Sequence, residues 1–264
     1  MRVFPAPSPT VWPEARPLRL GDGDTGIVIS HGFTGSVASV APWARGLAEP
    51  SGEWPGARVV APRLPGHGTS WQDLARTRWW DWYGAVEDAY LGLAAECSAV
   101  FVAGLSMGGA LALRLASLHP VDGVLLVNPA VASRDRRIPV AARLRNVLPP
   151  QRGISSDIAD PAQREPGYPR FSVKSLGTMD DLWRDTRPRL PRVSAPTLLL
   201  RSAQDHVVDD LSGELIRAAV PRVEERVLTR SYHVATMDYD RQRIIDESRR
   251  FILDIGAAGP RGAS

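Results

Sequence analysis

The 264-residue sequence contains very little cysteine and lysine, and it has no long uninterrupted apolar run. With one cysteine, Cys97, the chain cannot form an internal disulfide, which favours a reducing compartment. No stretch approaches the roughly 18 apolar residues of a membrane span, and the proline-rich segment 1–17 lacks the apolar core of a secretory signal. We therefore expect a cytoplasmic protein, for which peripheral contact with membranes remains open.

Lysine is almost absent, with Lys174 as the single example, so the positive charge comes from arginine. The formal net charge is only +3, although the pI is about 9.4. The arginines are scattered among acidic residues, which is typical of a solvated surface and not of a nucleic-acid site. The densest group, within residues 134–145, is interpreted as a solvated face with carboxylate partners; attraction to an anionic membrane is the alternative. We expect no nucleic-acid partner.

Short apolar runs alternate with helix-forming segments along most of the chain. The runs occupy residues 27–29, 59–61, 100–103, 124–127, 197–200 and 223–228, and the helical segments lie near 41–47, 82–95, 110–118, 212–219 and 242–255. Continuous apolar strands that alternate with helices predict an α/β fold, in which a mostly parallel central sheet is flanked by helices on both faces.

This alternation stops between residues 130 and 193, where arginine and proline become frequent. A segment of this length without strand pattern is too long for a simple loop. We interpret it as a mainly helical cap, or lid, over the C-terminal edge of the sheet, where open α/β sheets bind ligands. The predicted domains are a core of residues 1–129 and 194–264 and a cap insertion of residues 130–193.

Residues 104–109 read GLSMGG and place one serine among three glycines. The preceding apolar run predicts a strand, and the residues that follow predict a helix. Ser106 therefore lies on a tight strand-to-helix turn, where the flanking positions must be small because other backbone passes close to them. Gly104 and Gly108 complete the G-x-S-x-G pattern of a nucleophilic serine. The alternative is a glycine-rich turn with an incidental serine.

A serine hydroxyl is a weak nucleophile that needs a base, and the base needs a carboxylate to orient it. The chain order serine, acid, histidine is typical of enzymes with this turn, and the acid and the histidine follow late strands. Asp205 and His233 each follow a predicted strand in the second half of the chain. We therefore predict Ser106, Asp205 and His233 as a catalytic triad. Asp209 and Asp210 are alternative acids, but they are placed to cap the next helix.

Acyl transfer through a serine also needs backbone donors for the negative charge that develops on the carbonyl oxygen. We expect one donor to be the N–H of Met107, at the start of the helix after the serine. The other is expected from Phe33 in the loop 31–35, HGFTG, where glycines let the chain curl toward the serine. The five histidines lie in separate loops without metal-ligand spacing, so we expect neither a metal nor a cofactor.

Five stretches together resemble the bacterial monoacylglycerol lipase and carboxylesterase branch of the α/β-hydrolase superfamily. They are HGFTGS from His31, PRLPGHGTSWQDL from Pro62, GLSMGG from Gly104, QDHVVDD from Gln204 and SYHVATMDYD from Ser231. The resemblance covers most of the core and implies an α/β-hydrolase fold. It also implies the same triad and the same two oxyanion donors as the pattern of the residues does.

The cap resembles this family less closely, but the resemblance implies two substrate contacts there. A glutamate at the place of Glu165 is expected to reach a glycerol hydroxyl, and an aliphatic residue at the place of Ile154 is expected to line the acyl path. Pro166 and Gly167, directly after the glutamate, depart from the family pattern. A solvated cap carboxylate is therefore the alternative interpretation of Glu165.

These features predict a serine hydrolase that cleaves carboxylic esters through an acyl-enzyme, with monoacylglycerols as its small amphiphilic substrates. A general short- to medium-chain carboxylesterase or thioesterase with the same triad is the first alternative. A non-catalytic ligand sensor on the hydrolase fold is the second, since a binding protein can keep an intact triad. A haloalkane dehalogenase is disfavoured because its nucleophile would be an aspartate where this chain has Ser106.

Overall fold

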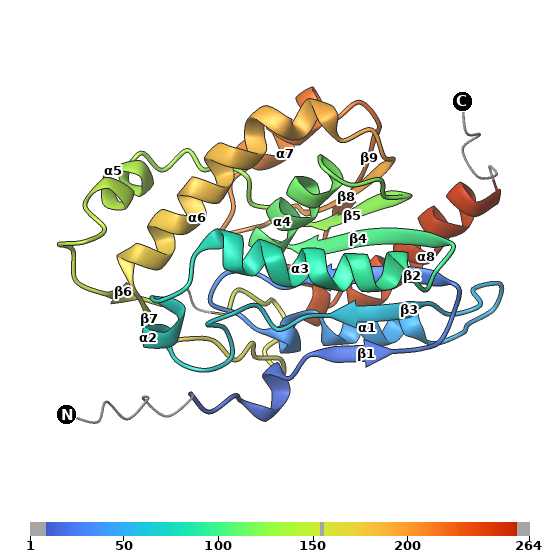
Figure 1. Cartoon of the computed structure of the whole chain (residues 1–264), viewed down its shortest axis with the longest axis horizontal. Coiled ribbons are helices and arrows are strands. Elements are labelled where there is room, and N and C mark those ends of the chain that lie inside the picture. The colour runs from blue at the N-terminus through green and yellow to red at the C-terminus, as the bar shows by residue number, and fades with distance from the viewer. Residues whose placement is uncertain (1–8, 154–155, 258–264) are drawn as a thin grey trace.

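Residues 9–153 and 156–257, which the computed structural model describes, are built around a seven-stranded sheet (Figure 1). Its strand order is β1-β3-β2-β4-β5-β8-β9. The strands are β1 (Leu18–Leu20), β2 (Thr25–Ser30), β3 (Arg58–Ala61), β4 (Ala99–Leu105), β5 (Gly123–Val127), β8 (Thr197–Ser202) and β9 (Val223–Leu228). Strand β1 pairs with β3 in the antiparallel sense, and the other neighbours run parallel. The predicted mostly parallel sheet is confirmed.

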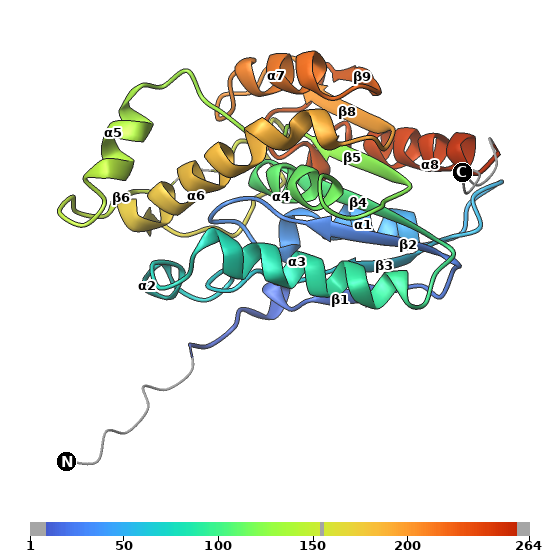
Figure 2. The same cartoon turned by 45° about the horizontal axis from the view of Figure 1, so that its top comes forward.

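Helices cover both faces of this sheet (Figures 1 and 2). One face carries α1 (Ala41–Ala48) and α8 (Arg241–Ala257), and the other carries α3 (Trp79–Ala94), α4 (Met107–Ala116), α6 (Val173–Thr186) and α7 (Leu211–Ala219). Within β2, Ile27 and Ile29 belong to the apolar cluster with α1 and α8, whereas Val28 belongs to the cluster with α3 and α4. Because alternate side chains of a strand point to opposite faces, a strand buried on both sides must be continuously apolar.

The segment predicted as the cap contains helices and a small two-stranded ribbon that the sequence did not indicate. Its elements are α5 (Arg137–Arg143), β6 (Gln151–Arg152), β7 (Arg170–Phe171), α6 and the 3₁₀ helix η3 (Arg187–Arg192). Helix α5 lies at the outer end of the molecule, against α6 (Figures 1 and 2). Leu182 and Trp183 of α6 are buried in the same apolar cluster as Leu111 of α4. The boundary at residue 193 stays a prediction, and α6 is a helix that cap and core share.

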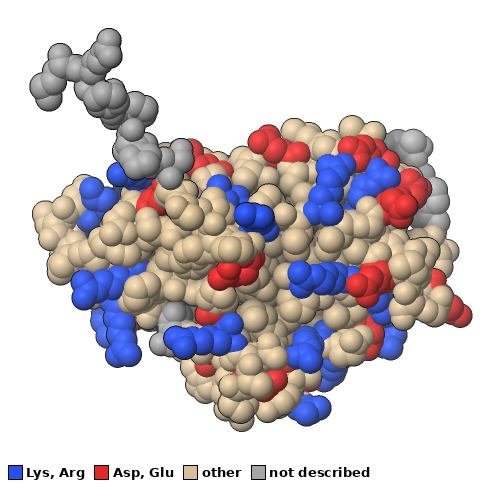
Figure 3. All heavy atoms as spheres, turned by 90° about the horizontal axis from the view of Figure 1, so that it is seen from below, with Lys and Arg blue, Asp and Glu red and all other residues tan. Residues whose placement is uncertain are grey.

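Shorter elements complete the described chain: α2 (Trp71–Leu74) and the 3₁₀ helices η1 (Pro13–Ala15), η2 (Val37–Ser39) and η4 (Ala235–Met237). No helix in the described residues is long and apolar enough to cross a lipid bilayer. Figure 3 shows basic and acidic side chains interspersed on the face seen from below Figure 1. In the arginine-rich segment 134–145, three arginines have carboxylate partners: Arg134 with Glu214, Arg137 with Asp135 and Arg145 with Asp181.

Candidate active site

Ser106 lies at the turn between β4 and α4, at the C-terminal edge of the sheet. Its backbone has φ 56° and ψ −122°, a conformation that residues with a side chain rarely adopt and that carries strain. A Cβ atom added at Gly104 would lie 2.2 Å from the carbonyl oxygen of Gly108, and one added at Gly108 would lie 2.2 Å from that of Ser30. Close backbone packing around the serine therefore requires the glycines of the G-x-S-x-G pattern.

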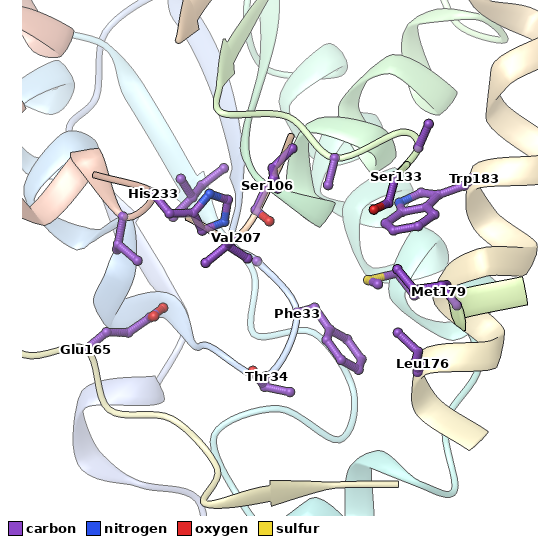
Figure 4. Close-up of a pocket in the computed structure, with 17 residues that line it drawn as sticks. Phe33, Thr34, Ser106, Ser133, Glu165, Leu176, Met179, Trp183, Val207 and His233 are labelled. Atoms are coloured by element: carbon purple, nitrogen blue, oxygen red, sulfur yellow. The ribbon is translucent and has the colours of Figure 1, made fainter. Parts of the chain in front are cut away.

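The structure brings Asp205 and His233 together from two loops at the same sheet edge. Nδ1 of His233 lies 2.8 Å from Oδ2 of Asp205, and each side chain is only 8% exposed. The other carboxylate oxygen accepts the N–H groups of Val207 at 2.9 Å and Val208 at 2.8 Å. Figure 4 shows the ring of His233 beside the side chain of Ser106. The three predicted triad residues therefore converge on one point.

Hydrogen bonds keep the Asp205 carboxyl ionised. Burial by itself raises the pKa of Asp205, but the hydrogen bonds from His233 and from two backbone N–H groups outweigh burial and hold that pKa below its ordinary value. An ionised Asp205 accepts a proton-bearing Nδ1, so Nε2 of a neutral His233 is free to accept the proton of a serine hydroxyl. The pair thus has the geometry of a general base and its orienting carboxylate.

The two alternative acids have other partners. Asp209 accepts the N–H of Leu211 at 3.0 Å, at the first residue of α7. Asp210 is exposed and pairs with Arg201 at 2.5 Å. Asp209 therefore acts at the start of the helix, as the sequence indicated, and Asp205 is the carboxylate that contacts the histidine.

The predicted oxyanion donors come from two segments next to Ser106. Met107 is fully buried as the first residue of α4, and Phe33 lies in the loop after β2. A Cβ atom at Gly32 in this loop would lie 3.2 Å from the Cβ atom of Ser106. Within the described part of the chain, the backbone N–H groups of Phe33 and Met107 have no acceptor. Unpaired donors beside a serine are what a developing oxyanion requires.

His31 orients the loop that carries Phe33. Its Nδ1 lies 3.0 Å from the carbonyl oxygen of Gly32, and its Nε2 accepts the N–H of Leu64 at 3.3 Å. Burial lowers the pKa of His31 to about 4, so at neutral pH the ring is neutral and carries its proton on Nδ1. The Gly32 carbonyl and the Phe33 N–H belong to one planar peptide group. A hydrogen bond that fixes the carbonyl therefore also fixes the direction of the N–H.

Ser106 lines a cavity of about 130 Å³ that opens to solvent. One side of the cavity is apolar and is formed by Leu176, Met179 and Trp183 of α6, with Ile138 of α5. Figure 4 shows the three α6 side chains on one side of Ser106 and Glu165 on the other. The serine thus lies between an apolar arm and a carboxyl group.

Glu165 reaches the cavity from the segment between β6 and β7. Its Oε1 would lie 2.5 Å from a Cβ atom added at Gly35, which places the carboxyl against the loop that carries Phe33. Burial raises the pKa of Glu165 to about 7, although the nearby His233 and Ser39 act to lower it. Part of the residue is accessible to solvent, but its carboxyl end faces the cavity (Figure 4). The second predicted cap residue, Ile154, lies outside the described residues.

Asn128, which the sequence did not indicate, ties the histidine loop to the sheet. It follows β5 with φ 44° and is 1% exposed. Its Nδ2 donates to the carbonyl oxygen of His233 at 2.8 Å and to the Ser202 hydroxyl at 2.9 Å, and its Oδ1 accepts the Ser202 N–H at 2.7 Å. Asparagine after a strand is a common turn residue, so nothing in its position marks this role.

No group of three or more His, Cys, Asp or Glu side chains is arranged to hold a metal ion within residues 9–153 and 156–257. The described site instead combines a strained serine, an oriented histidine, unpaired backbone donors and an apolar cavity. These parts together can perform nucleophilic acyl transfer.

Comparison with known proteins agrees with this chemistry. The Alpha/beta hydrolase family matches residues 27–247. The chain is 37% identical over 247 residues to the thermostable monoacylglycerol lipase of Bacillus sp. strain H-257, covering 90% of this chain and 94% of that protein. It is 26% identical over 243 residues to a carboxylesterase of Bacillus subtilis strain 168, covering 90% and 96%. A solved structure from work on the metagenome-derived lipolytic enzymes LipS and LipT superposes with a TM-score of 0.87 at 34% identity, covering 93% of this chain and all of the other.

Proposed function

The chain belongs to the alpha/beta hydrolase family, and from this premise we propose that it is a serine hydrolase that cleaves monoacylglycerols to a fatty acid and glycerol. The observation that carries the proposal is the position of Ser106 between an apolar arm and the Glu165 carboxyl (Figure 4). A monoacylglycerol has the same asymmetry, because its reactive ester joins a hydrocarbon chain to a diol. Its acyl chain would occupy the α6 side and its glycerol would face Glu165.

In the proposed reaction, Oγ of Ser106 attacks the ester carbonyl carbon while its proton passes to Nε2 of His233. The N–H groups of Phe33 and Met107 stabilise the oxyanion, and an ionised Asp205 stabilises the imidazolium. The imidazolium then gives its proton to the glycerol oxygen as the carbon–oxygen bond breaks, which leaves the acyl group on the serine. Water then attacks the acyl-enzyme carbonyl while its proton passes to His233, and the collapse of this second intermediate releases the fatty acid and restores the serine.

Replacing Glu165 with glutamine should reduce the preference for glyceryl esters over simple alkyl esters. A hydrogen bond between a glycerol hydroxyl and a carboxylate contributes roughly 1.5–3 kcal/mol, which corresponds to about 10- to 100-fold in kcat/KM. We expect wild type to prefer 1-lauroylglycerol over ethyl laurate by this factor, and Glu165→Gln to lose most of the preference. Glu214→Gln, a change at an exposed glutamate that pairs with Arg134, is the matched control.

The same preference should depend on pH near neutrality. Because the pKa of Glu165 is raised to about 7, its carboxyl is mostly protonated at pH 6 and mostly ionised at pH 8. Ionised acceptors form the stronger hydrogen bonds, so the ratio of glyceryl to ethyl hydrolysis should rise over this range and stay flat in Glu165→Gln. Equal rates on the two esters at both pH values would favour the alternative, a general carboxylesterase or thioesterase. Tight ligand retention without turnover would indicate a non-catalytic sensor.

We also propose that the outer surface of the cap contacts lipid aggregates. Four apolar side chains on and after α5 are exposed: Val140 is 56% exposed, Leu144 47%, Val147 76% and Leu148 37%. Arg136 and Arg143 lie in the same stretch, and neither forms an ion pair with any described residue. An apolar surface flanked by free cations fits an anionic lipid surface. Ile138 on the same helix lines the cavity, so a lipid bound outside would be near the acyl arm. The cytoplasmic location stays a prediction.

The double variant Leu144→Ser/Val147→Ser should bind phosphatidylglycerol vesicles at least about 10-fold more weakly than wild type, because two apolar side chains no longer enter the lipid. Vesicle co-sedimentation at low and high salt measures this, and salt should weaken the wild-type binding. Leu118→Ser, at a leucine that is 50% exposed two residues past the end of α4, is the control. Hydrolysis of water-soluble p-nitrophenyl butyrate should be the same in wild type, the double variant and the control. Unchanged vesicle binding in the double variant would contradict a docking surface on α5.

A further inference from the structure

A short stretch of the cap, residues 156–160, is hydrogen-bonded to both loops that supply the Asp205–His233 pair. It lies between β6 and β7, on the N-terminal side of Glu165 in the same segment. The proposed reaction uses none of its side chains. Its contacts nevertheless go mainly to His206, which directly follows Asp205, and to His233 itself.

Asp157 makes the central contacts of this stretch. Its Oδ2 accepts the backbone N–H of His233 at 3.1 Å and that of His206 at 3.2 Å. Its Oδ1 lies 2.8 Å from Nδ1 of the His206 ring, and its own carbonyl oxygen accepts the N–H of Val234 at 3.0 Å. Because the Asp157 side chain is only 15% exposed, water competes weakly for these bonds. One carboxylate therefore bridges the residue after Asp205 to the histidine that Asp205 contacts.

Two further contacts hold the same loops. The His206 ring packs edge-on against the ring of Tyr232, with 4.6 Å between centroids, directly before His233. Asp238, which is fully buried, accepts the N–H groups of Ala159 at 2.7 Å and Asp160 at 3.0 Å from the cap, and that of Tyr232 at 2.9 Å from the histidine loop. The cap stretch is thus fastened to the histidine loop at both of its ends.

The cap stretch also connects to the proposed glycerol carboxyl. The hydroxyl of Ser156 accepts the backbone N–H of Glu165 at 3.0 Å, and Ser156 directly precedes Asp157. A continuous run of hydrogen bonds and one peptide link therefore joins the glutamate that faces the cavity to the loops of the catalytic pair. A displacement of the cap in this region would move both groups together.

We propose that Asp157 is a positioning residue that sets the placement of His233 relative to Asp205. This inference rests on the proposed function. Asp157 contacts the backbone of His233 and not its ring, so it acts through the loop and takes no part in proton transfer. Without the bridge the two loops can shift relative to each other, and a misplacement of about 1 Å near a reacting group can cost on the order of 10²-fold in rate.

Two substitutions at this position separate positioning from charge. Asp157→Asn keeps an oxygen that can accept the backbone N–H groups of His206 and His233. Its amide nitrogen can donate to Nδ1 of a neutral His206 ring that carries its proton on Nε2. Asp157→Ala removes every side-chain acceptor. We expect the alanine variant to lower kcat by roughly 10- to 100-fold for glyceryl and ethyl laurate alike, with KM changed less than about 3-fold, and the asparagine variant to restore kcat to within about 3-fold of wild type.

The control is Asp160→Ala, because among the described residues the Asp160 side chain accepts only the N–H of Ala162, two residues further along the cap. Thermal unfolding shows whether each variant is folded, and proton NMR of the Nδ1 proton that His233 shares with Asp205 reports the pair directly. This resonance should shift or broaden in Asp157→Ala and stay in place in Asp157→Asn and Asp160→Ala.

Wild-type kcat and an unmoved resonance in a folded Asp157→Ala protein would overturn the proposal. So would an asparagine variant as slow as the alanine variant, because the charge and not the acceptor geometry would then be required. If wild type hydrolyses neither ester, the proposed function fails. The resonance of the Asp205–His233 pair still tests the positioning role in that case, so the two failures are distinguishable.

Discussion

Ser106→Ala is expected to lower the turnover of 1-lauroylglycerol by on the order of 10⁶-fold. The change removes the atom that attacks the ester carbonyl, and the remaining oxyanion donors and cavity can only assist a water molecule. Alanine keeps a Cβ atom and adds nothing to the turn, in which φ is already 56°. The variant should therefore fold like wild type and bind substrate, and the loss should appear in kcat. Steady-state hydrolysis followed by fatty-acid release measures it.

Ser117→Ala is the matched control for this experiment. Ser117 ends the same helix, and its hydroxyl donates only to the carbonyl oxygen of Arg114, so hydrolysis should stay within about 2-fold of wild type, as for surface changes in general. Circular dichroism melting of both variants shows that the fold is kept. A Ser106→Ala protein that retains more than a small percentage of wild-type turnover would exclude this serine as the nucleophile.

Asp205→Asn is expected to lower kcat by about 10⁴-fold. The amide nitrogen of asparagine can donate to Nδ1 of His233, which selects the tautomer with a proton on Nε2. Such a ring cannot accept the serine proton. Since both side chains are only 8% exposed, water cannot easily replace the lost carboxylate. The loss should be less at high pH, where hydroxide can take over part of the base function, and a kcat profile against pH measures this change.

The control for the acid is Asp210→Asn, the exposed alternative carboxylate that pairs with Arg201. Its kcat should remain within about 2-fold of wild type, because the pair is exposed and such pairs contribute little. If Asp210→Asn were the slow variant and Asp205→Asn the active one, the assignment of the acid would be reversed. A thermal melt of both proteins accompanies the comparison and shows that each variant is folded.

The repeating core and the loops that carry the chemistry could be predicted because their signals are local. Apolar runs on the central strands mark burial on both faces, and G-x-S-x-G marks a turn where a Cβ atom added at either glycine would lie 2.2 Å from backbone. Asp205 and His233 could be selected because chain order and strand ends limit where an acid and a histidine can meet. Edge strand β1 and the ribbon of β6 and β7 have only two or three residues each, too few for a periodic pattern.

The residues that hold the site together could not be predicted in the same way. Asn128, Asp157 and Asp238 bond chiefly to backbone N–H and carbonyl groups of distant segments. Backbone groups are the same in every residue, so no spacing of residue types indicates these contacts. The packing of α6 against the core could not be predicted for a related reason. Its apolar face contacts α4, which is far from α6 in the sequence.

The most direct test of the central claim is to react the wild-type protein with a fluorophosphonate and to locate the modified residue by peptide mass spectrometry. This reagent phosphonylates a serine that a neighbouring histidine activates, so it reports the nucleophile independently of the choice of ester. We predict a single modified serine, Ser106, with complete loss of hydrolysis, and no modification of Ser106→Ala or of a protein without His233. Loss of hydrolysis with Ser106 unmodified, or modification of another serine, would contradict the account.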